Sequence, residues 1–276
     1  MRIELNDVTK SIGGQMILNH ITLSMTSGKV YGFQGINGSG KTMLMRAIIG
    51  LIHLNEGDVK IDGKKLGKDI EFPESVGFLL ENPTFLDRYS GKDNLKLLAD
   101  IRGKAEESRI NEVLRIVGLD VQEKKKYKKY SLGMKQRLGI AAAILEMPDL
   151  IILDEPANAL DMSGVEMLKK IIQMERERGA LVILSCHDAV LLQEMSDVIF
   201  EIEQGKILSV KEKKMEAGKY AFWWTLRSGD WEISSFWQIS RIIKYPWSWE
   251  FLKIFLPEPE RYRQSFRKYV PETGCA

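Results

Sequence analysis

The feature that most constrains this chain is a glycine-rich loop between an apolar segment, 30–34, and a helix-forming segment, 42–49. Loops of this type direct backbone N–H groups and a helix N-terminus at phosphate oxygens. The loop fits the pattern G-x-x-x-x-G-K-[ST], and its residues are Gly35, Ile36, Asn37, Gly38, Ser39, Gly40, Lys41 and Thr42. The sequence therefore predicts a nucleotide site in which Lys41 faces the β- and γ-phosphates and the Thr42 hydroxyl binds Mg²⁺.

Strand and helix signals alternate around this loop. Residues 2–9 and 21–25 are predicted as short strands. Two apolar runs, 150–153 and 181–184, are bounded by polar residues, as is typical of parallel strands buried on both faces. Gln204–Gly205 separates two further apolar segments and predicts a hairpin. We therefore predict an α/β fold with a mostly parallel sheet and antiparallel strands near the N-terminus.

Residues 89–146 differ from their surroundings, because their apolar residues recur at helical spacing and no strand pattern stands out. Gly118 and Ser131 are suited to the end of one helix and the beginning of another. We predict an all-helical subdomain at about 89–146, inserted into an α/β domain that covers 1–217.

The composition changes near Gly218. Residues 218–276 contain all 6 Trp and 15 of the 24 aromatic residues, and their net charge is +3 against −1 for the rest of the chain. We predict a separate Trp-rich C-terminal extension. Three interpretations remain open for it, namely a segment at a membrane interface, a docking segment for a membrane protein, and a lobe packed on the α/β domain.

Several classes of protein are disfavoured by the sequence. No segment approaches the roughly 20 apolar residues of a membrane-spanning helix, and the N-terminus lacks a signal-peptide pattern. Cys186 and Cys275 are too few for a disulfide framework and suit a reducing compartment. The lysine-rich run 124–129 is most simply a solvated loop, and we expect no nucleic-acid partner.

Further polar residues follow the predicted buried strands. Asp154 and Glu155 come directly after 150–153, and His187 comes shortly after 181–184. Asp154 is predicted to hold Mg²⁺ through water, and Glu155 to polarise an attacking water as general base. Between the loop and these carboxylates, the segment Tyr130-Ser-Leu-Gly-Met-Lys-Gln-Arg137 opens a helix.

Taken in order, these elements resemble the ATP-binding subunits of ABC transporters over about residues 2–217. The resemblance implies the fold of an ABC-type P-loop NTPase, with ATP and Mg²⁺ as cofactors. It implies a second ATPase subunit, identical or paralogous, and a separate integral membrane permease. By the same resemblance, Asp161 is the D-loop aspartate and His187 reaches the γ-phosphate. Ser131 and Gly133 belong to the family signature, which contacts the γ-phosphate bound to the opposite subunit.

Three departures from the common family pattern are visible. Glu81 stands where most members have glutamine, and we predict that it is catalytic and a metal ligand. Leu132 and Met134 replace a glycine and a glutamine of the signature. Glu81 and the form Ser-Leu-Gly-Met-Lys-Gln-Arg resemble the bacitracin-resistance and lantibiotic-immunity exporters. Ile12 stands about where the family often stacks an aromatic ring on adenine, a contact worth about 1–3 kcal/mol elsewhere.

The predicted function is an ATP-hydrolysing subunit that powers an exporter of antimicrobial peptides or drug-like compounds. It would lie at the cytoplasmic face of the cell membrane and dock on its permease near 81–93. One alternative is a soluble ABC-type ATPase of translation or DNA repair, which a single ATPase domain and the short helical insertion disfavour. The other is a nucleotide-dependent regulator without turnover, which Glu155 and His187 disfavour.

Overall fold

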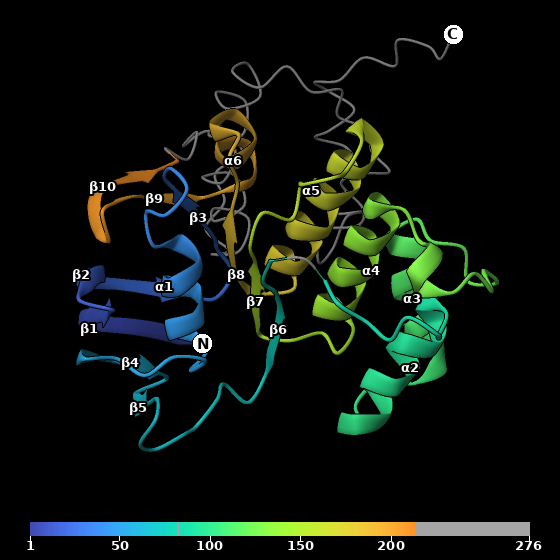
Figure 1. Ribbon diagram of the computed structural model, residues 1–276, viewed down its shortest axis with the longest axis horizontal. Helices are drawn as coiled ribbons and strands as arrows, with labels where there is room; N and C mark the ends of the chain where they lie inside the picture. Colours follow the sequence, from blue (N-terminus) through green and yellow to red (C-terminus); the bar gives the residue numbers. More distant parts are fainter. Residues whose placement is uncertain (82, 214–276) are drawn as a thin grey trace, which may run out of the picture. The chain divides into compact units, whose positions relative to one another are not determined.

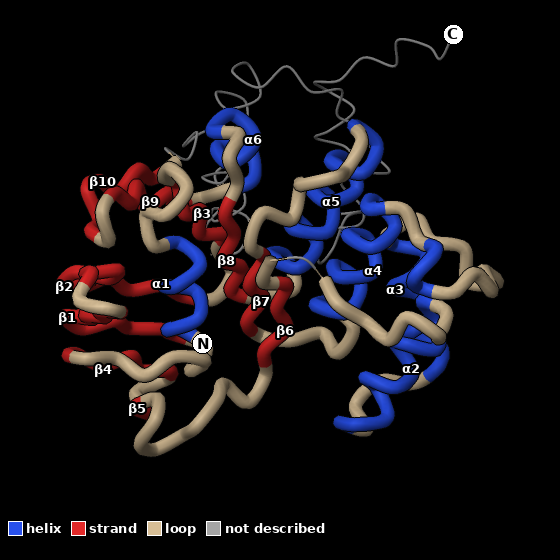
Figure 2. Tube along the Cα trace, viewed as in Figure 1, coloured by secondary structure: helices blue, strands red, loops and turns tan. Residues whose placement is uncertain are grey.

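Two β-sheets form the framework of the computed structural model, which describes residues 1–81 and 83–213 (Figures 1 and 2). Residues 1–213 form one compact unit. The predicted extension 218–276 lies outside the described residues. No helix among the described residues is long and apolar enough to cross a membrane.

The larger sheet has six strands in the order β10-β9-β3-β8-β7-β6, and all neighbours except β10 and β9 are parallel. Every residue of the apolar runs in β7 and β8 is buried, which confirms the predicted parallel strands and the α/β class. The Gln204–Gly205 hairpin joins β9 to β10, as predicted, with φ of 47° and 73°. The strands are β3 (Val30–Gln34), β6 (Val76–Leu79), β7 (Leu150–Leu153), β8 (Leu181–Ser185), β9 (Val198–Glu203) and β10 (Lys206–Glu212).

The smaller sheet is antiparallel, with the order β2-β1-β4-β5. Its strands are β1 (Arg2–Ile12), β2 (Gln15–Thr26), β4 (Glu56–Ile61) and β5 (Lys64–Lys65). β2 begins six residues before the predicted segment 21–25, because irregular pairing with β1 interrupts the alternation of buried and exposed residues on which that prediction relied. The antiparallel N-terminal strands are confirmed.

Helices cover the two faces of the parallel sheet differently (Figure 1). Helix α1 (Lys41–Ile48) and the antiparallel sheet share one apolar core with Leu181 and Ile183 of β8. The alternate β8 residues, Val182 and Leu184, belong to the core on the other face. That face is covered by α4 (Leu132–Ile144), α5 (Met162–Glu177) and α6 (Ala189–Met195). The sheet therefore separates α1 from α4.

Between β6 and α4 the described chain is helical, with no strand. Its elements are α2 (Gly91–Arg102), α3 (Glu107–Ile116) and a 3₁₀ turn (Tyr127–Lys129). A reciprocal cap between Ser90 and Asp93 begins α2. Gly118, with φ of 70°, follows the end of α3, and Ser131 caps α4, as predicted. The lysines of 124–129 are exposed, whereas Tyr127 is buried among the helices.

Helix α4 lies directly on β6, with glycines at the contact. A Cβ atom at Gly77 would lie 1.7 Å from the carbonyl oxygen of Ala143. On the helix, a Cβ at Gly139 would lie 2.9 Å from the Leu79 side chain. Since real Cβ atoms essentially never come this close to a backbone atom, position 77 needs glycine to keep this spacing, whereas at position 139 the Leu79 side chain would have to move.

Candidate nucleotide-binding site

The glycine-rich loop follows β3 and ends where α1 begins at Lys41. Gly40 has φ of 108°, a conformation that L side chains rarely adopt. A Cβ at this position would also lie 2.8 Å from the carbonyl oxygen of Ile17 on β2. Glycine at position 40 therefore lets the loop turn into α1 while touching the neighbouring sheet.

The Lys41 side chain is held inside its own loop. Its ammonium group donates to the carbonyl oxygens of Gly35 at 2.7 Å and Ile36 at 3.1 Å, and the residue is 6% exposed. These two bonds keep the charge beside the loop, where a polyanion would meet it. The Ser39 hydroxyl is buried in the same loop without a hydrogen-bond partner.

Asp154 joins the loop to the end of β7. Its carboxylate accepts hydrogen bonds from the hydroxyls of Thr42 and Ser185, each at 2.5 Å. The Ser185 hydroxyl also accepts the backbone N–H of Glu155 at 2.9 Å, so it orients both carboxylate residues. Sequence reasoning missed Ser185, although Leu153 pairs with Leu184 and this register places the next residues of the two strands side by side.

Glu155 and His187 lie against each other. One Glu155 carboxylate oxygen accepts the backbone N–H of His187 at 3.0 Å, and the other lies 3.4 Å from His187 Nε2. That second oxygen, Oε1, is buried and makes no hydrogen bond. Burial raises the pKa of Glu155 above its ordinary value, and the nearby His187 opposes part of this shift. A partly desolvated carboxylate with an unused oxygen is suited to accept a proton from water.

Two cavities flank the glycine-rich loop. One, of about 280 Å³, is lined by loop residues together with Asp154 and Glu155. The other, of about 420 Å³, is lined by Gly35 and Ile36 on one side and His187 on the other. The structure thus brings the loop, Asp154, Glu155 and His187 together, as expected for a single phosphate-binding centre.

The oxygen atoms at the loop suit Mg²⁺. The Thr42 hydroxyl and an Asp154 carboxylate oxygen are adjacent, and both are the hard oxygen ligands that this ion accepts alongside water. Both residues line the cavity of about 280 Å³ beside the loop. The residues present therefore fit the cofactor that the sequence predicted.

The predicted signature residues lie elsewhere. Neither Ser131 nor Gly133 lines either cavity, and the Ser131 hydroxyl accepts the Met134 N–H at 3.2 Å as the N-cap of α4. Asp161 caps α5 by accepting the Gly164 N–H at 2.8 Å, and Arg137 of α4 pairs with it at 3.1 Å. The backbone hydrogen bond from Gly164 lowers the pKa of Asp161.

Glu81 is also apart from the centre. Its carboxylate pairs with the Arg46 guanidinium of α1 at 2.5 Å, and its side chain is 61% exposed. It lines neither cavity, so the structure does not bring it to Thr42 and Asp154. The backbone of Glu81 has a positive φ of 59°. Glu155 and Ala159 also have positive φ values, of 50° and 64°. Such backbones are costly for side chains other than glycine and often occur at functional sites.

Gln136 is a second residue that sequence reasoning missed. It is buried, and its side-chain amide donates to the carbonyl oxygen of Pro156 at 3.1 Å. This bond ties α4 to the segment after Glu155. The only sequence signal is a glutamine in the first turns of a helix. Neither its burial nor its hydrogen-bond partner could be read from spacing.

Comparison with known proteins places this geometry in a family. Residues 18–158 match the family described as "ABC transporter". An uncharacterised ABC transporter ATP-binding protein of Bacillus subtilis, YybJ, is 42% identical over 74% of this chain and 94% of its own length. The bacitracin transport ATP-binding protein BcrA of Bacillus licheniformis is 38% identical over 75% of this chain and 68% of its own.

Two further comparisons agree with these. The lantibiotic transport ATP-binding protein SrtF of Streptococcus pyogenes is 35% identical over 76% of this chain and 90% of its own. Among solved structures, a dimer of the ATP-binding cassette MJ0796 bound to ADP and Pi superposes with a TM-score of 0.69 at 22% identity. It covers 76% of this chain and 98% of that protein. At this identity the likeness establishes the fold, which confirms the predicted cassette architecture.

Proposed function

The chain belongs to the ABC transporter family as an ATP-binding subunit, and from this we propose that it hydrolyses ATP to drive export of antimicrobial peptides or related drug-like compounds. The proposal of ATP hydrolysis rests on one observation. The phosphate loop, Asp154, Glu155 and His187 lie around one centre. The proposed location is the cytoplasmic face of the membrane, through contact with a permease.

The proposed chemistry assigns one task to each side chain. Lys41 exchanges its loop carbonyls for phosphate oxygens, and the loop N–H groups hold the same anion. Glu155 takes a proton from the attacking water through Oε1, the carboxylate oxygen that makes no hydrogen bond. His187, held by Glu155, contacts the terminal phosphate. Thr42 and Asp154 would hold Mg²⁺, which neutralises developing charge on the phosphates.

A second ATPase subunit completes the proposed site. Ser131 and Gly133 are exposed or partly exposed at the N-terminus of α4, away from this chain's own loop. A helix N-terminus favours an anion, so these residues would meet the nucleotide of a partner subunit, identical or paralogous. The likeness to dimeric cassettes supports this arrangement.

The proposed permease contact is the region that begins at Glu81 and continues into α2. Several large apolar side chains there are exposed, including Ile101 at 80% and Leu86 at 54%. The others are Tyr89, Leu97 and Leu98. Apolar patches of this kind mark protein contacts. The permease helix would pack beside Glu81, where breaking its pair with Arg46 would free the carboxylate for its predicted role near Mg²⁺.

The substrate class rests on relatives. BcrA and SrtF are named for bacitracin and lantibiotic transport, and this chain carries the Glu81 and Ser-Leu-Gly-Met-Lys-Gln-Arg forms that resemble their branch. We therefore propose an amphiphilic peptide antibiotic as the transported molecule.

The test uses Glu155→Gln, which keeps the size of the side chain and removes the general base. The tagged variant is expressed in the source organism and purified from detergent-solubilised membranes with ATP present. Recovery of a multi-span membrane protein is expected, and expression of that pair in a sensitive host should raise resistance to peptide antibiotics. Lys41→Ala, which removes the phosphate contact, is the matched control and should recover less of the partner.

Two results would contradict the proposal. Recovery from the soluble fraction with ribosomes or DNA would favour a soluble ABC-type ATPase and remove the transport role. A permease complex without ATP hydrolysis by the wild-type chain would instead favour a nucleotide-dependent regulator.

A further inference from the structure

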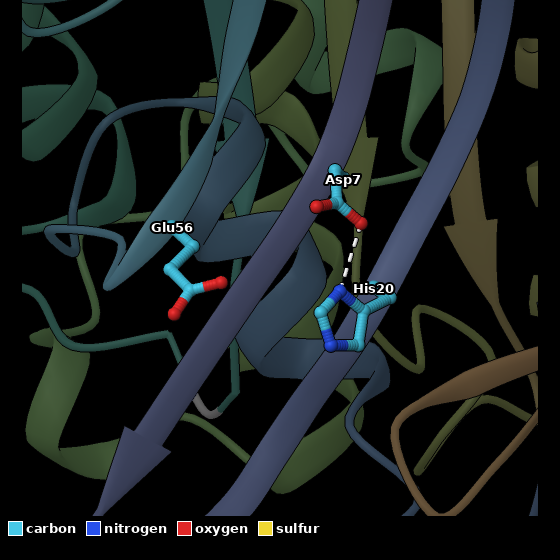
Figure 3. A group of neighbouring side chains, drawn as sticks. All are labelled: Asp7, His20 and Glu56. Carbon is cyan, nitrogen blue, oxygen red and sulfur yellow. Dashed lines mark hydrogen bonds and ion pairs between the residues drawn. The ribbon is translucent and has the colours of Figure 1, made fainter.

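Three side chains with metal-binding atoms converge on the exposed face of the antiparallel sheet, away from the nucleotide site. Asp7 lies on β1, His20 on β2 and Glu56 at the start of β4 (Figure 3). One ligand atom from each lies within 4.8 Å of the others. Among the described residues this is the one group of three or more such side chains with this spacing.

Irregular strand pairing produces this convergence. Between the pairs Leu5–Leu23 and Val8–Ile21, two residues of β1 face one residue of β2, and Asp7 is one of the two. Immediately beyond, one residue of β1 faces two of β2, and His20 is one of them. Asp7 and His20 have positive φ of 54° and 55°. These successive bulges turn the Asp7 and His20 side chains to the same exposed face. In a regular strand, one of the two residues in each bulge would instead be buried.

The charges in this group are poorly balanced. Asp7 and Glu56 bring two carboxylates together, and among the described residues the only ion-pair partner of Asp7 is His20 Nδ1 at 2.8 Å. Glu56 has no ion pair, and within the described chain no lysine or arginine nitrogen lies within 4.0 Å of either carboxylate. Like charges this close repel each other, and a divalent cation between them would remove the repulsion.

The ligand set selects the kind of cation. One imidazole nitrogen with two carboxylate oxygens suits Zn²⁺ and similar first-row ions. Mg²⁺ prefers oxygen ligands and gains little from histidine. Ligand atoms around a shared Zn²⁺ lie closer together than 4.8 Å, and the exposed side chains can rotate to close that gap because the Asp7 and His20 side chains are 64% and 57% exposed.

We propose that Asp7, His20 and Glu56 form a binding site for Zn²⁺ or a similar first-row divalent ion. The bound ion links β1, β2 and β4, the strands that share a core with α1. The site is independent of the nucleotide centre, because none of its three residues lines either cavity beside the glycine-rich loop. Its effect is to stabilise the antiparallel sheet against unfolding.

The test is zinc binding to the nucleotide-free full chain, by calorimetric titration with ZnCl₂ and by thermal unfolding. At zinc concentrations about a hundred times the Kd, we expect Tm to rise by roughly 5 °C or more. MgCl₂ at the same concentration should leave Tm unchanged. Cobalt(II), used as a spectroscopic probe, should give visible absorption bands that ZnCl₂ removes.

Asp7→Asn, His20→Asn and Glu56→Gln remove one ligand each, and asparagine tolerates the positive φ at positions 7 and 20. Each should weaken zinc binding at least about tenfold, the loss that even outer-shell partners cause. Each zinc-dependent shift is measured from that variant's own metal-free Tm, so a change in basal stability does not obscure it.

His53→Asn makes the same substitution at an exposed histidine outside the group, and Asp154→Asn removes a carboxylate of the nucleotide centre. Both should bind zinc as the wild-type chain does. The proposal is overturned if wild type shows no zinc-dependent shift, or if His20→Asn keeps the full shift. A shift lost in Asp154→Asn alone would assign the zinc to the nucleotide centre instead.

Discussion

The two ends of the proposed ATP site are built differently within one chain. At the glycine-rich loop, the functional side chains are buried or half-buried and bonded to one another, as in the contacts of Asp154 with Thr42 and Ser185. At the signature, Ser131 is exposed and bonded only to its own helix. Folding alone preorganises the first end. At the second end, folding completes the N-cap of a helix, but the proposed nucleotide contact also needs a second subunit.

Substitutions at the two ends should therefore have different effects. A change at the loop end alters chemistry that one subunit assembles by itself. A change at the signature end should leave the isolated subunit intact and act only when a second subunit supplies or receives the contact. The experiments below separate these two behaviours.

The largest effect is expected from Glu155→Gln at the loop end. Loss of a general base typically costs 10²–10⁴-fold in rate, so we expect kcat for ATP hydrolysis to fall by about that factor while ATP still binds. Steady-state hydrolysis and a nucleotide-binding titration measure the two quantities. Glu177→Gln, on the exposed end of α5, is the matched control and should hydrolyse ATP normally.

The stability of this variant gives a further check. Because burial raises the pKa of Glu155, the folded chain holds this proton to higher pH than the unfolded chain does. The ionised carboxylate therefore opposes folding above that pKa, and Glu155→Gln should melt at the same or a higher temperature at pH 7.5. A clear fall in Tm would contradict the assignment of a desolvated carboxylate.

At the signature end, Ser131→Asp keeps a good N-cap and adds a negative charge. We expect unchanged Tm for the isolated subunit, but ATP-dependent dimerisation and turnover reduced at least about tenfold by repulsion from phosphate. Ser131→Asn keeps the cap without the charge and is the control. Equal turnover in both variants would mean that Ser131 serves only as a helix cap.

Ser185→Ala tests the preorganisation of the loop end directly. It leaves Asp154 Oδ1 and the Glu155 N–H without their shared partner, which costs about 1–3 kcal/mol in the free energy of unfolding. Denaturant unfolding measures this loss, and hydrolysis should fall with it because both carboxylates lose their support. Ser24→Ala on the exposed face of β2 is the control. An unchanged unfolding energy would mean that water replaces the hydroxyl.

The pH profile supplies a smaller and independent effect. Glu155 must be ionised to act as a base, and burial raises its pKa, so the acid limb of kcat/KM should lie at a higher pH than an ordinary glutamate would give. Hydrolysis measured from pH 8 downward should decline through this limb. The residual rate of Glu155→Gln should be flat over the same range, and a matching decline in that variant would assign the limb to another group.

The smallest effect is expected at Ile12, which ends β1 with 51% of its surface exposed. Ile12→Tyr adds a ring able to stack on adenine, a contact worth about 1–3 kcal/mol elsewhere. We expect a gain near the lower end of this range, because isoleucine already supplies apolar contact, so the Kd for ATP should fall by roughly five- to tenfold with no change in the Kd for tripolyphosphate. Ile12→Leu is the control, and equal gains for both ligands would exclude stacking.

The sequence predicted elements that depend on local pattern. The apolar runs 150–153 and 181–184 became adjacent parallel strands, and short apolar runs bounded by polar residues are typical of strands buried on both faces. It predicted the glycine-rich loop for a similar reason, because its spacing encodes one backbone shape. The family comparison confirms the ABC assignment that these motifs supported.

Features that depend on pairing between distant residues were not predictable. The early part of β2 was missed because bulges near His20 break the alternation that marks a strand. The Glu81–Arg46 pair requires a positive φ and an exposed turn, neither of which the residue type indicates. Ser185 looks like the polar end of an apolar run until the strand register puts it beside Asp154.

The backbone contact between α4 and β6 has a consequence for how such a chain tolerates mutation. A single methyl group at position 77 would displace the helix that begins with the proposed signature residues, because the added carbon would meet the Ala143 carbonyl. The contacts within the glycine-rich loop would not change, yet the distance between the two ends of the site would. A substitution at position 77 can therefore cause loss of function far from any bound ligand. Compensating substitutions in α4 could later restore the function.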